Sequence, residues 1–368
     1  MNSSKPVKVE FICGSYPPIK DGVGYYMQRL SQHLKVDHKI ITSVGAEKTA
    51  ITEPFVGNWR QGVAKKIAMQ VKKDQANLIH MQYSSVKFGR TLGSTLIPKE
   101  VSKQLKLPVV VTSHEYHDAS WLGRKRVEVL IKPVEDVIVS NQADYKVLSR
   151  RFPRKNFYVV PIGSNIEVAK FSDGQLNDLK SKYNPGHKKL ILTWGLLDQN
   201  KGVDKLVEAV SRVGSSAKLL ISSGYNPKDQ YHKELNKQIA HTSADIDWLG
   251  YLSDSEISGL LQICDIVALP FNQPVSLRRG SVLAALAHGK PVITTGPSQD
   301  KLLQDRKNCY LLANNKPYTI ELAINDLLND PKLSKLLASG AHELAAHFDW
   351  NNIAKLHESI YKQILSRR

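Results

Sequence analysis

Basic side chains next to glycine turns are the residues of this chain best suited to chemistry. In LTWGLLDQNKGVDKLVEAV, Lys201 stands between an expected strand and an expected helix. In LPFNQPVSLRRGSVLAALAH, an apolar helix follows directly on four candidate binding residues: Arg278, Arg279, Gly280 and Ser281. A guanidinium group can donate two parallel hydrogen bonds to the oxygens of one phosphate. The first turn of a helix offers N–H donors and the positive end of its dipole. We expect a phosphate site here, with a solvated basic turn as the alternative.

A second glycine turn lies near the N-terminus, in CGSYPPIKDGVGYYMQRLSQHL. Gly22, Val23 and Gly24 follow the first expected strand and open a helix, where an anion or a hydroxylated ligand can approach the backbone. The dinucleotide sequence G-x-G-x-x-G is incomplete, because Tyr25 and Tyr26 follow in place of further glycine. A turn that only reverses the chain is the alternative.

His114 ends an expected strand in VVVTSHEYHD, at the edge where parallel sheets bind ligands. We regard it as the catalytic candidate, with a buried structural histidine as the alternative. Together with Glu115, His117 and Asp118 it could imitate a metal cluster. The spacing fits no usual zinc pattern, so we expect no metal site.

Strand-like and helix-like segments alternate along the whole chain, which predicts an α/β fold. The expected strands are VKVEFIC, HKIITSV, NLIHMQY, LPVVVTSH, ADYKVLS and FYVVPIG, then KKLILTWG, AKLLISSG, IDWLGYL, DIVALPF, KPVITT and NCYLLA. A polar stretch without strands, near 166–187, separates the two sets. We therefore expect two Rossmann-like doubly wound domains joined near 170–185, which face each other across a cleft that holds the ligand.

Composition limits the classes of function. With 368 residues, 42% hydrophobic and 23% charged, the chain is typical of a globular enzyme too long for a single core. No apolar run approaches the ~20 residues that span a bilayer, and MNSSKPVKVEFIC enters a strand directly, without the layout of a signal peptide. Cys13, Cys264 and Cys309 are far apart, which favours buried thiols in a reducing cytoplasm.

The net charge of +17 is concentrated in the first half. Residues 1–165 hold 26 basic and 13 acidic side chains, and the remainder holds 25 and 21. SWLGRKRVEVLIKPVEDVIV places three basic residues, Arg124, Lys125 and Arg126, beside Trp121 and Leu122, a mixture suited to anionic lipid headgroups. An ordinary surface helix is the alternative. Nucleic-acid binding is disfavoured, because no aromatic platform accompanies the basic residues.

In their order, these segments resemble retaining glycosyltransferase family 4, which has the GT-B fold. The resemblance rests on YPPIKDGVGYYMQRLSQHL, NLIHMQY, VVVTSH, VVPIGSNI, GLLDQNKGVDKLVEAV, WLGYLSDSEISGLLQICDIVALPF, LAALAHGKPVITT and FDWNNIAKLHESIYKQIL. It implies an acceptor-side domain at 1–170, a nucleotide-sugar-binding domain at 171–345, and a last helix at 346–368 that crosses back to the first domain. The donor is a nucleoside-diphosphate sugar and no cofactor is needed.

The resemblance also implies roles for single residues. Gly22 to Gly24 border the donor sugar and diphosphate, His114 lies beside the sugar, and Lys201 binds the diphosphate. The departures from the family pattern are Leu196 in place of a phosphate-binding arginine, Ser276 and Ala284 in place of paired glutamates, and Asp21 in place of a glycine. We expect Arg278 and Arg279 to supply the missing positive charge.

The resulting hypothesis is a metal-independent, retaining hexosyl- or pentosyltransferase of envelope polysaccharide or glycolipid synthesis. The implied partners are a nucleotide-sugar donor, a glycan or lipid-linked acceptor and an anionic membrane surface. The implied location is the cytoplasm or the inner membrane face. A non-catalytic nucleotide-sugar-binding subunit is the competing hypothesis, since both glutamates are replaced. An epimerase or phosphorylase on the same fold is a third, for which we find neither the carboxylates nor a cofactor lysine site.

Overall fold

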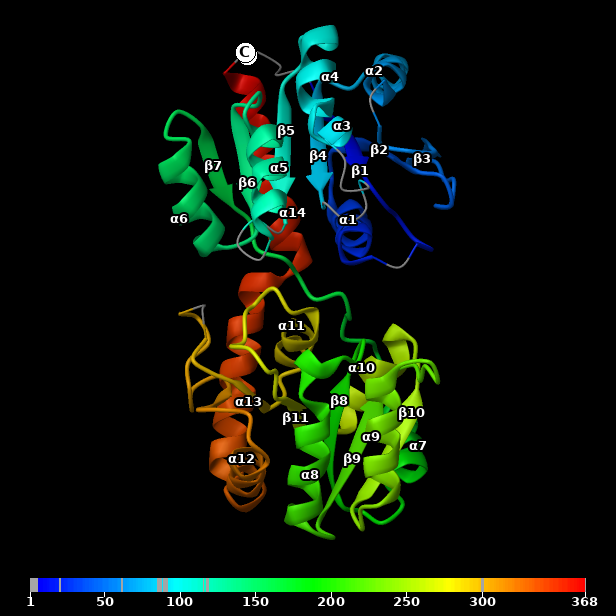
Figure 1. The fold of residues 1–368 in the computed structure, drawn as a ribbon, viewed down its shortest axis with the longest axis vertical. Helices are drawn as coiled ribbons and strands as arrows, with labels where there is room; N and C mark the ends of the chain where they lie inside the picture. Colours follow the sequence, from blue (N-terminus) through cyan, green and yellow to red (C-terminus); the bar gives the residue numbers. More distant parts are fainter. Residues whose placement is uncertain are drawn as a thin grey trace. The chain divides into compact units, whose positions relative to one another are not determined.

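The computed structural model describes residues 6–19, 21–60, 62–84, 88, 92–114, 116, 119–298 and 301–367. The chain divides into two compact units (Figure 1). The first unit consists of Met1–Gly163 and Trp350–Arg368, and the second unit of Ser164–Asp349. No helix among the described residues is long and apolar enough to cross a membrane.

The first unit is built on a seven-stranded parallel sheet of order β3-β2-β1-β4-β5-β6-β7. Its strands are β1 (Lys8–Cys13), β2 (Asp37–Ser43), β3 (Thr52–Val56), β4 (Leu78–Tyr83), β5 (Val109–Ser113), β6 (Asp136–Val139) and β7 (Asn156–Val159). Its helices are α1 (Gly22–His33), α2 (Val63–Asp74), α3 (Leu92–Thr95), α4 (Ile97–Leu105), α5 (Trp121–Ile131), α6 (Gln142–Arg151) and α14 (Trp350–Ser366). The strand order reverses at β1 and β4, as in a doubly wound fold.

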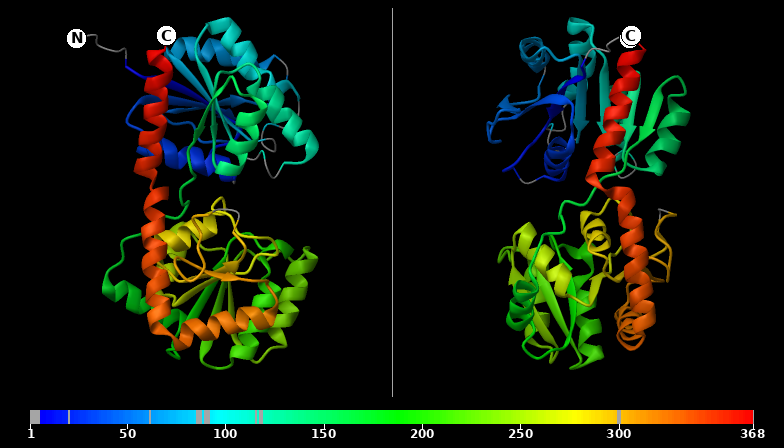
Figure 2. Two further views of the ribbon diagram at one scale, coloured as in Figure 1. Left: turned by 90° about the vertical axis from the view of Figure 1, so that its left-hand side faces the viewer. Right: turned by 180° about the vertical axis from the view of Figure 1, so that it is seen from behind.

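Two apolar cores lie on the two faces of this sheet. On one face, α1 and α14 pack against side chains such as Phe11 and Val110. On the other face, α2, α4 and α5 cover a core that contains Ile12 and Val111. Figure 2 shows α14, in red, running along the sheet of the first unit. The last helix of the chain is thus an integral part of the first unit.

One expected strand is a helix. ADYKVLS lies within α6, and the strand of this region is β6, with the sequence DVIV. Asn141 caps the helix, because its side chain accepts a hydrogen bond from the backbone N–H of Asp144. Val147 is exposed while Leu148 is buried, as on an amphipathic helix. A further strand, β3, was not predicted.

The second unit contains a six-stranded parallel sheet of order β10-β9-β8-β11-β12-β13. Its strands are β8 (Lys189–Trp194), β9 (Ala217–Ser222), β10 (Asp245–Gly250), β11 (Ile266–Leu269), β12 (Val292–Thr295) and β13 (Tyr310–Leu312), and all six were predicted. Its helices are α7 (Asp173–Tyr183), α8 (Val203–Val213), α9 (Gln230–Ala240), α10 (Asp254–Ile263), α11 (Gly280–Ala287), α12 (Pro317–Asn329) and α13 (Pro331–Ala345). Short 3-10 turns occupy η1 (Gln199–Lys201) and η2 (Ala346–Phe348).

The stretch expected to link the domains is structured. Most of residues 170–185 form α7, which begins with a reciprocal capping arrangement between Ser172 and Gln175. This helix packs against α10 of the second unit. The division between the units falls earlier, after Gly163.

A close approach in the second unit makes one glycine sensitive. A Cβ at Gly340 in α13 would collide with the backbone carbonyl oxygen of Lys307. We expect Gly340→Ala to lower the free energy of unfolding by about 2 kcal/mol, because the helix must move away from this backbone. Gly174→Ala is the matched control, since its Cβ would meet only Ser172 Oγ, at 3.9 Å. Urea unfolding of both variants checks this; equal midpoints would contradict the packing described.

Candidate functional site

The turn that carries Lys201 is held in place by the glycine after it. Gly202 has a φ of 65°, and a Cβ there would collide with the carbonyl oxygen of Pro270, which follows β11. Only glycine allows this conformation together with this approach. The Lys-Gly pair therefore fixes the lysine beside the carboxyl end of β11.

Lys201 and Arg279 lie on the same aromatic ring. The ammonium of Lys201 is 5.3 Å from the ring centroid of Phe271, and the guanidinium carbon of Arg279 is 3.9 Å from it. Cations over an aromatic face are attracted by its quadrupole. A Cβ at Gly195 would lie 3.2 Å from the Lys201 ammonium, so this glycine leaves room for the charge. Two residues predicted from separate motifs are thus brought together.

The N-terminus of α11 adjoins these cations. Arg279 is the N-cap residue of this fully described helix, which has no side-chain capping bond and no acidic residue in its first turn. The N–H groups of Gly280 and Ser281 therefore point out of the helix end. A Cβ at Gly280 would lie 3.5 Å from Asn165 Nδ2, which places an amide next to the helix start.

The electrostatics of this cluster favour an anion. Burial, and to a smaller extent the neighbouring charge of Arg279, lower the pKa of Lys201 to about 8, while the charge of Asp198 partly opposes both effects. Two like charges this close together in a partly buried site favour the binding of an anion. A diphosphate would supply that charge, and the helix end would supply hydrogen bonds.

The residues that depart from the family pattern lie in or near this cluster. Leu196 is 90% exposed next to the Gly195 turn, and Ala284 is fully buried in α11. Ser276 accepts the Arg279 N–H through its backbone carbonyl, at 3.2 Å. The Ala284 methyl group cannot bind a ribose hydroxyl. Arg278 is half-buried and adjacent, but the ring contact is made by Arg279.

The first glycine turn differs in character from the start of α11. Asp21 is the N-cap of α1, and its Oδ2 accepts from Ser15 Oγ at 2.5 Å and from the Gly24 N–H at 3.1 Å. A carboxylate thus already occupies a helix start expected to favour an anion. A Cβ at Gly24 would lie 3.1 Å from the Ser15 carbonyl oxygen, whereas Gly22 faces open space and Val23 is half-buried.

His114 follows β5 and is half-buried. Its Nε2 lies 2.8 Å from Gln82 Oε1, and its ring stands edge-on to that of Tyr26, with centroids 4.9 Å apart. Burial lowers the pKa of His114 to about 4, although the charge of Asp21 acts in the opposite direction. The ring is neutral near pH 7, which suits it to hydrogen bonding better than to strong base catalysis.

The possible metal cluster is only partly visible. Glu115, His117 and Asp118 lie outside the described residues. Within the described part of the chain, no group of three or more histidine, cysteine, aspartate or glutamate side chains could hold a metal ion. Cys13, Cys264 and Cys309 are buried free thiols.

Sequence reasoning missed two residues of the cation cluster and the cap of α1. Phe271 carries the two cations, and Asn165 stands beside the start of α11. Neither follows from its own motif, although LPF at the end of an expected strand was a usable signal for Phe271. The capping role of Asp21 could have been read from an aspartate directly before a helix.

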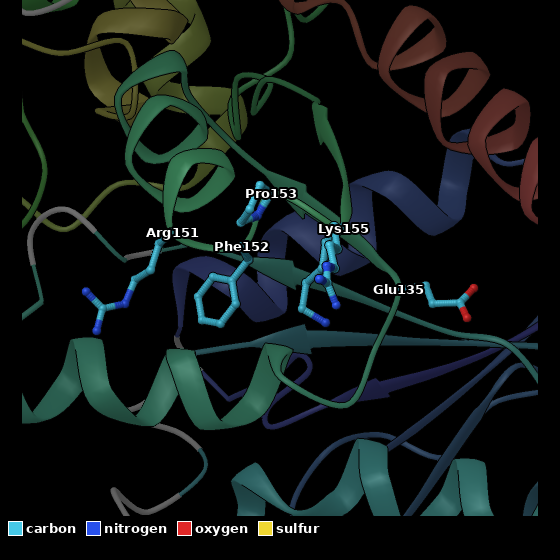
Figure 3. A pocket seen from close by; sticks show the side chains of 6 residues that line it. Glu135, Arg151, Phe152, Pro153 and Lys155 are labelled. Carbon is cyan, nitrogen blue, oxygen red and sulfur yellow. The ribbon is translucent and has the colours of Figure 1, made fainter.

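A hollow of about 300 Å³ lies in the first unit at the amino-terminal ends of its strands (Figure 3). It is lined by residues that precede β6 and β7, namely Glu135, Arg151, Phe152, Pro153, Arg154 and Lys155. His114 follows the carboxyl end of a strand, whereas this hollow is at amino ends. The Lys155 ammonium is bonded to the carbonyl of Lys132, at 2.9 Å, and to that of Val134. The hollow is therefore separate from the candidate site.

Comparison with known proteins gives a family match for part of the chain. Residues 188–330, within the second unit, match the family described as glycosyl transferases group 1. An uncharacterized glycosyltransferase of Methanocaldococcus jannaschii is 26% identical over 186 residues. That match covers 50% of this chain, and the chain spans only 50% of the relative's length.

Solved structures match over the whole chain. Anabaena HepE, in a complex with UDP, gives a TM-score of 0.80 at 19% identity and covers 97% of this chain and 100% of its own. A glycosyltransferase from Rickettsia africae gives 0.80 at 17% identity, with coverage of 99% and 100%. These likenesses confirm the predicted fold class of two parallel-sheet, Rossmann-like domains. The family match falls within the second of these domains.

Proposed function

We propose that this chain is a glycosyltransferase that moves a sugar from a nucleoside-diphosphate donor to an acceptor hydroxyl. The observation that carries the proposal is the placement of Lys201 and Arg279 on the ring of Phe271, beside the start of α11, whose N-cap side chain makes no capping bond. Fixed positive charge and backbone donors are what a diphosphate leaving group requires. The match of residues 188–330 to glycosyl transferases group 1 supports this assignment.

The reaction we propose retains the configuration at the anomeric carbon and uses no metal. The bond from that carbon to the donor's phosphate oxygen breaks, and the acceptor oxygen bonds to the same face. The acceptor proton passes to the departing phosphate oxygen. Lys201, Arg279 and the N–H groups of α11 stabilise the negative charge on the diphosphate, and Arg278 adds long-range positive charge. His114, neutral near pH 7, binds a sugar hydroxyl.

We propose a UDP-sugar as the first donor to test. The support is that solved complexes of Anabaena HepE hold UDP and UDP-glucose. Thermal-shift measurements with UDP, GDP, ADP and TDP test the choice, because a nucleotide that binds only the folded state raises the melting temperature with its concentration. Stabilisation by another nucleotide and none by UDP would overturn it.

The competing function is a nucleotide-sugar-binding subunit without catalysis. Its support is that Ser276 and the buried Ala284 replace the family's glutamates. A purified chain that binds nucleotide but neither transfers nor hydrolyses donor, with any acceptor extract, would establish this function. Donor turnover would exclude it.

We further propose that the acceptor is lipid-linked or part of an envelope glycan, reached from an anionic membrane surface. On α5, Trp121 and Leu122 are 69% and 57% exposed, and Arg124 and Lys125 are exposed beside them. Residues 119–155 carry nine basic and four acidic side chains. Exposed apolar side chains among basic ones are typical of helices that lie on anionic lipid.

Arg279→Ala tests the diphosphate site. We expect kcat/KM to fall about 100-fold, because a preorganised charge that faces the leaving group is lost. Arg306→Ala is the matched control, since Arg306 also lies over an aromatic ring, that of Tyr310, and pairs with Asp326. Steady-state kinetics with the donor found by thermal shift measure both variants. Near-normal kinetics for Arg279→Ala would remove the assignment.

The pKa of Lys201, about 8, predicts a pH dependence of nucleotide binding. Lys201 is cationic below this value and loses its proton above it, so affinity should be highest below pH 8 and fall up to tenfold per pH unit above it. Calorimetric titration with UDP between pH 7 and 10 measures this change. Lys201→Arg keeps its charge throughout and should flatten the profile; the same fall in that variant would assign the dependence to another group.

Membrane binding is tested by vesicle sedimentation. Replacing both Trp121 and Leu122 by Ala should weaken binding to vesicles that contain phosphatidylglycerol, because the buried apolar area is lost. Leu336→Ala is the control, since Leu336 is an exposed leucine of the second unit. Equal binding to zwitterionic and anionic vesicles, or no binding to either, would contradict the proposed surface.

A further inference from the structure

A chain of buried polar side chains runs through the first unit from His114 to the C-terminal helix. Its members come from four elements distant in sequence: Tyr26 in α1, His80 and Gln82 in β4, Thr112 in β5, and His357 and Tyr361 in α14. All are at most 5% exposed. Polar groups in such a core cost stability unless they are bonded to one another.

The distances trace one continuous path. Gln82 bonds His114 Nε2 through Oε1, at 2.8 Å, and reaches His80 Nε2 through Nε2, at 3.3 Å. His80 Nδ1 lies 2.7 Å from the hydroxyl of Tyr361. That hydroxyl lies 3.4 Å from His357 Nδ1, and His357 Nε2 lies 2.8 Å from the Tyr26 hydroxyl. Because the Tyr26 ring contacts the His114 ring, the path returns to its origin.

All three histidines of the path are neutral near pH 7. Burial, with a smaller contribution from the neighbouring histidines, lowers the pKa of His80 well below its usual value and that of His357 to about 3. A neutral imidazole has one N–H donor and one acceptor nitrogen. Each ring in the path therefore limits the tautomer of the next.

The position of the Gln82 amide sets the direction of the bonds. With its oxygen at His114, Nε2 of His114 carries the proton and donates. The amide N–H and the Thr112 hydroxyl, which lies 2.7 Å away, then donate to His80 Nε2. His80 donates from Nδ1 to Tyr361, Tyr361 donates to His357 Nδ1, and His357 donates from Nε2 to Tyr26. Nδ1 of His114 remains as an acceptor.

We propose that His80, His357 and Tyr361 are positioning residues that hold His114 in the Nε2–H tautomer, so that its Nδ1 accepts a hydrogen bond from a substrate hydroxyl. The role of the substrate hydroxyl rests on the proposed function, whereas the tautomer does not. The helix α14, more than two hundred residues after His114 in the sequence, is thereby part of the machinery that prepares this histidine.

Tyr361→Phe tests the proposal with the full-length chain. Without the hydroxyl, His80 Nδ1–H loses its acceptor. The His80 ring can then adopt its other tautomer, with the proton on Nε2. The side-chain amide of Gln82 can then flip, which exchanges its oxygen and nitrogen. His114 should become a mixture of two tautomers. Ring ¹⁵N shifts of histidine-labelled protein distinguish the tautomers directly. Turnover should fall about fivefold, the effect of losing one neutral hydrogen bond.

Tyr158→Phe is the control in the same unit, because it also removes a bonded hydroxyl, one that donates to Asp136 at 3.0 Å. It should leave the His114 tautomer and turnover unchanged. An Nδ1–H tautomer of His114 in the wild-type protein overturns the proposal, even if Tyr361→Phe fails to fold. So does an unchanged tautomer in Tyr361→Phe, or an equal loss of turnover in both variants. If no donor is turned over, the proposed function fails while the spectra still decide the tautomer.

Discussion

Two positive charges held on one aromatic ring are the constraint on which the second unit's site depends. Lys201 and Arg279 repel each other, and burial increases this cost, so the chain must hold them there by other means. The Phe271 ring attracts both cations. Asn315 holds the residues after β11 in place, because its side-chain amide donates hydrogen bonds to the carbonyls of Pro270, at 3.4 Å, and Phe271, at 3.2 Å. An anion bound here would offset the repulsion between the two cations.

Two helix starts illustrate how one residue changes what a helix end can bind. In α1 the Asp21 carboxylate accepts from the Gly24 N–H, so the positive end of the helix is neutralised by the chain itself. In α11 the N-cap is Arg279, which adds positive charge in place of negative charge. The proposed diphosphate site therefore lies at the start of α11. At the start of α1 we expect only uncharged hydroxyl groups to bind.

Much of the fold could be predicted from the sequence, because parallel strands buried on both faces give short apolar runs such as ILTW and VVVTS. ADYKVLS was mistaken for a strand because a short run with a few apolar residues fits a strand and one face of a helix equally well. Lys201, Arg278 and Arg279 were expected to serve one diphosphate, and the structure brings Lys201 and Arg279 onto one ring. The Phe271 ring that carries both cations could not be inferred from the sequence.

The hydrogen-bonded path behind His114 shows why other parts of a site resist prediction. His80 and Tyr361 are 281 positions apart, and nothing in either local sequence indicates the other. A histidine in NLIHMQY reads as one polar residue in an apolar strand, whose partner is decided only when α14 packs on the sheet. Long-range polar pairs of this kind depend on tertiary packing, which local propensity does not encode.

A crystal structure of the protein grown with UDP tests most directly where a diphosphate binds. We expect density for two phosphate groups against Lys201, Arg279 and the N–H groups of Gly280 and Ser281. Phosphate density at the start of α1 beside Asp21, with the Lys201–Arg279 cluster bound only to solvent, would contradict it.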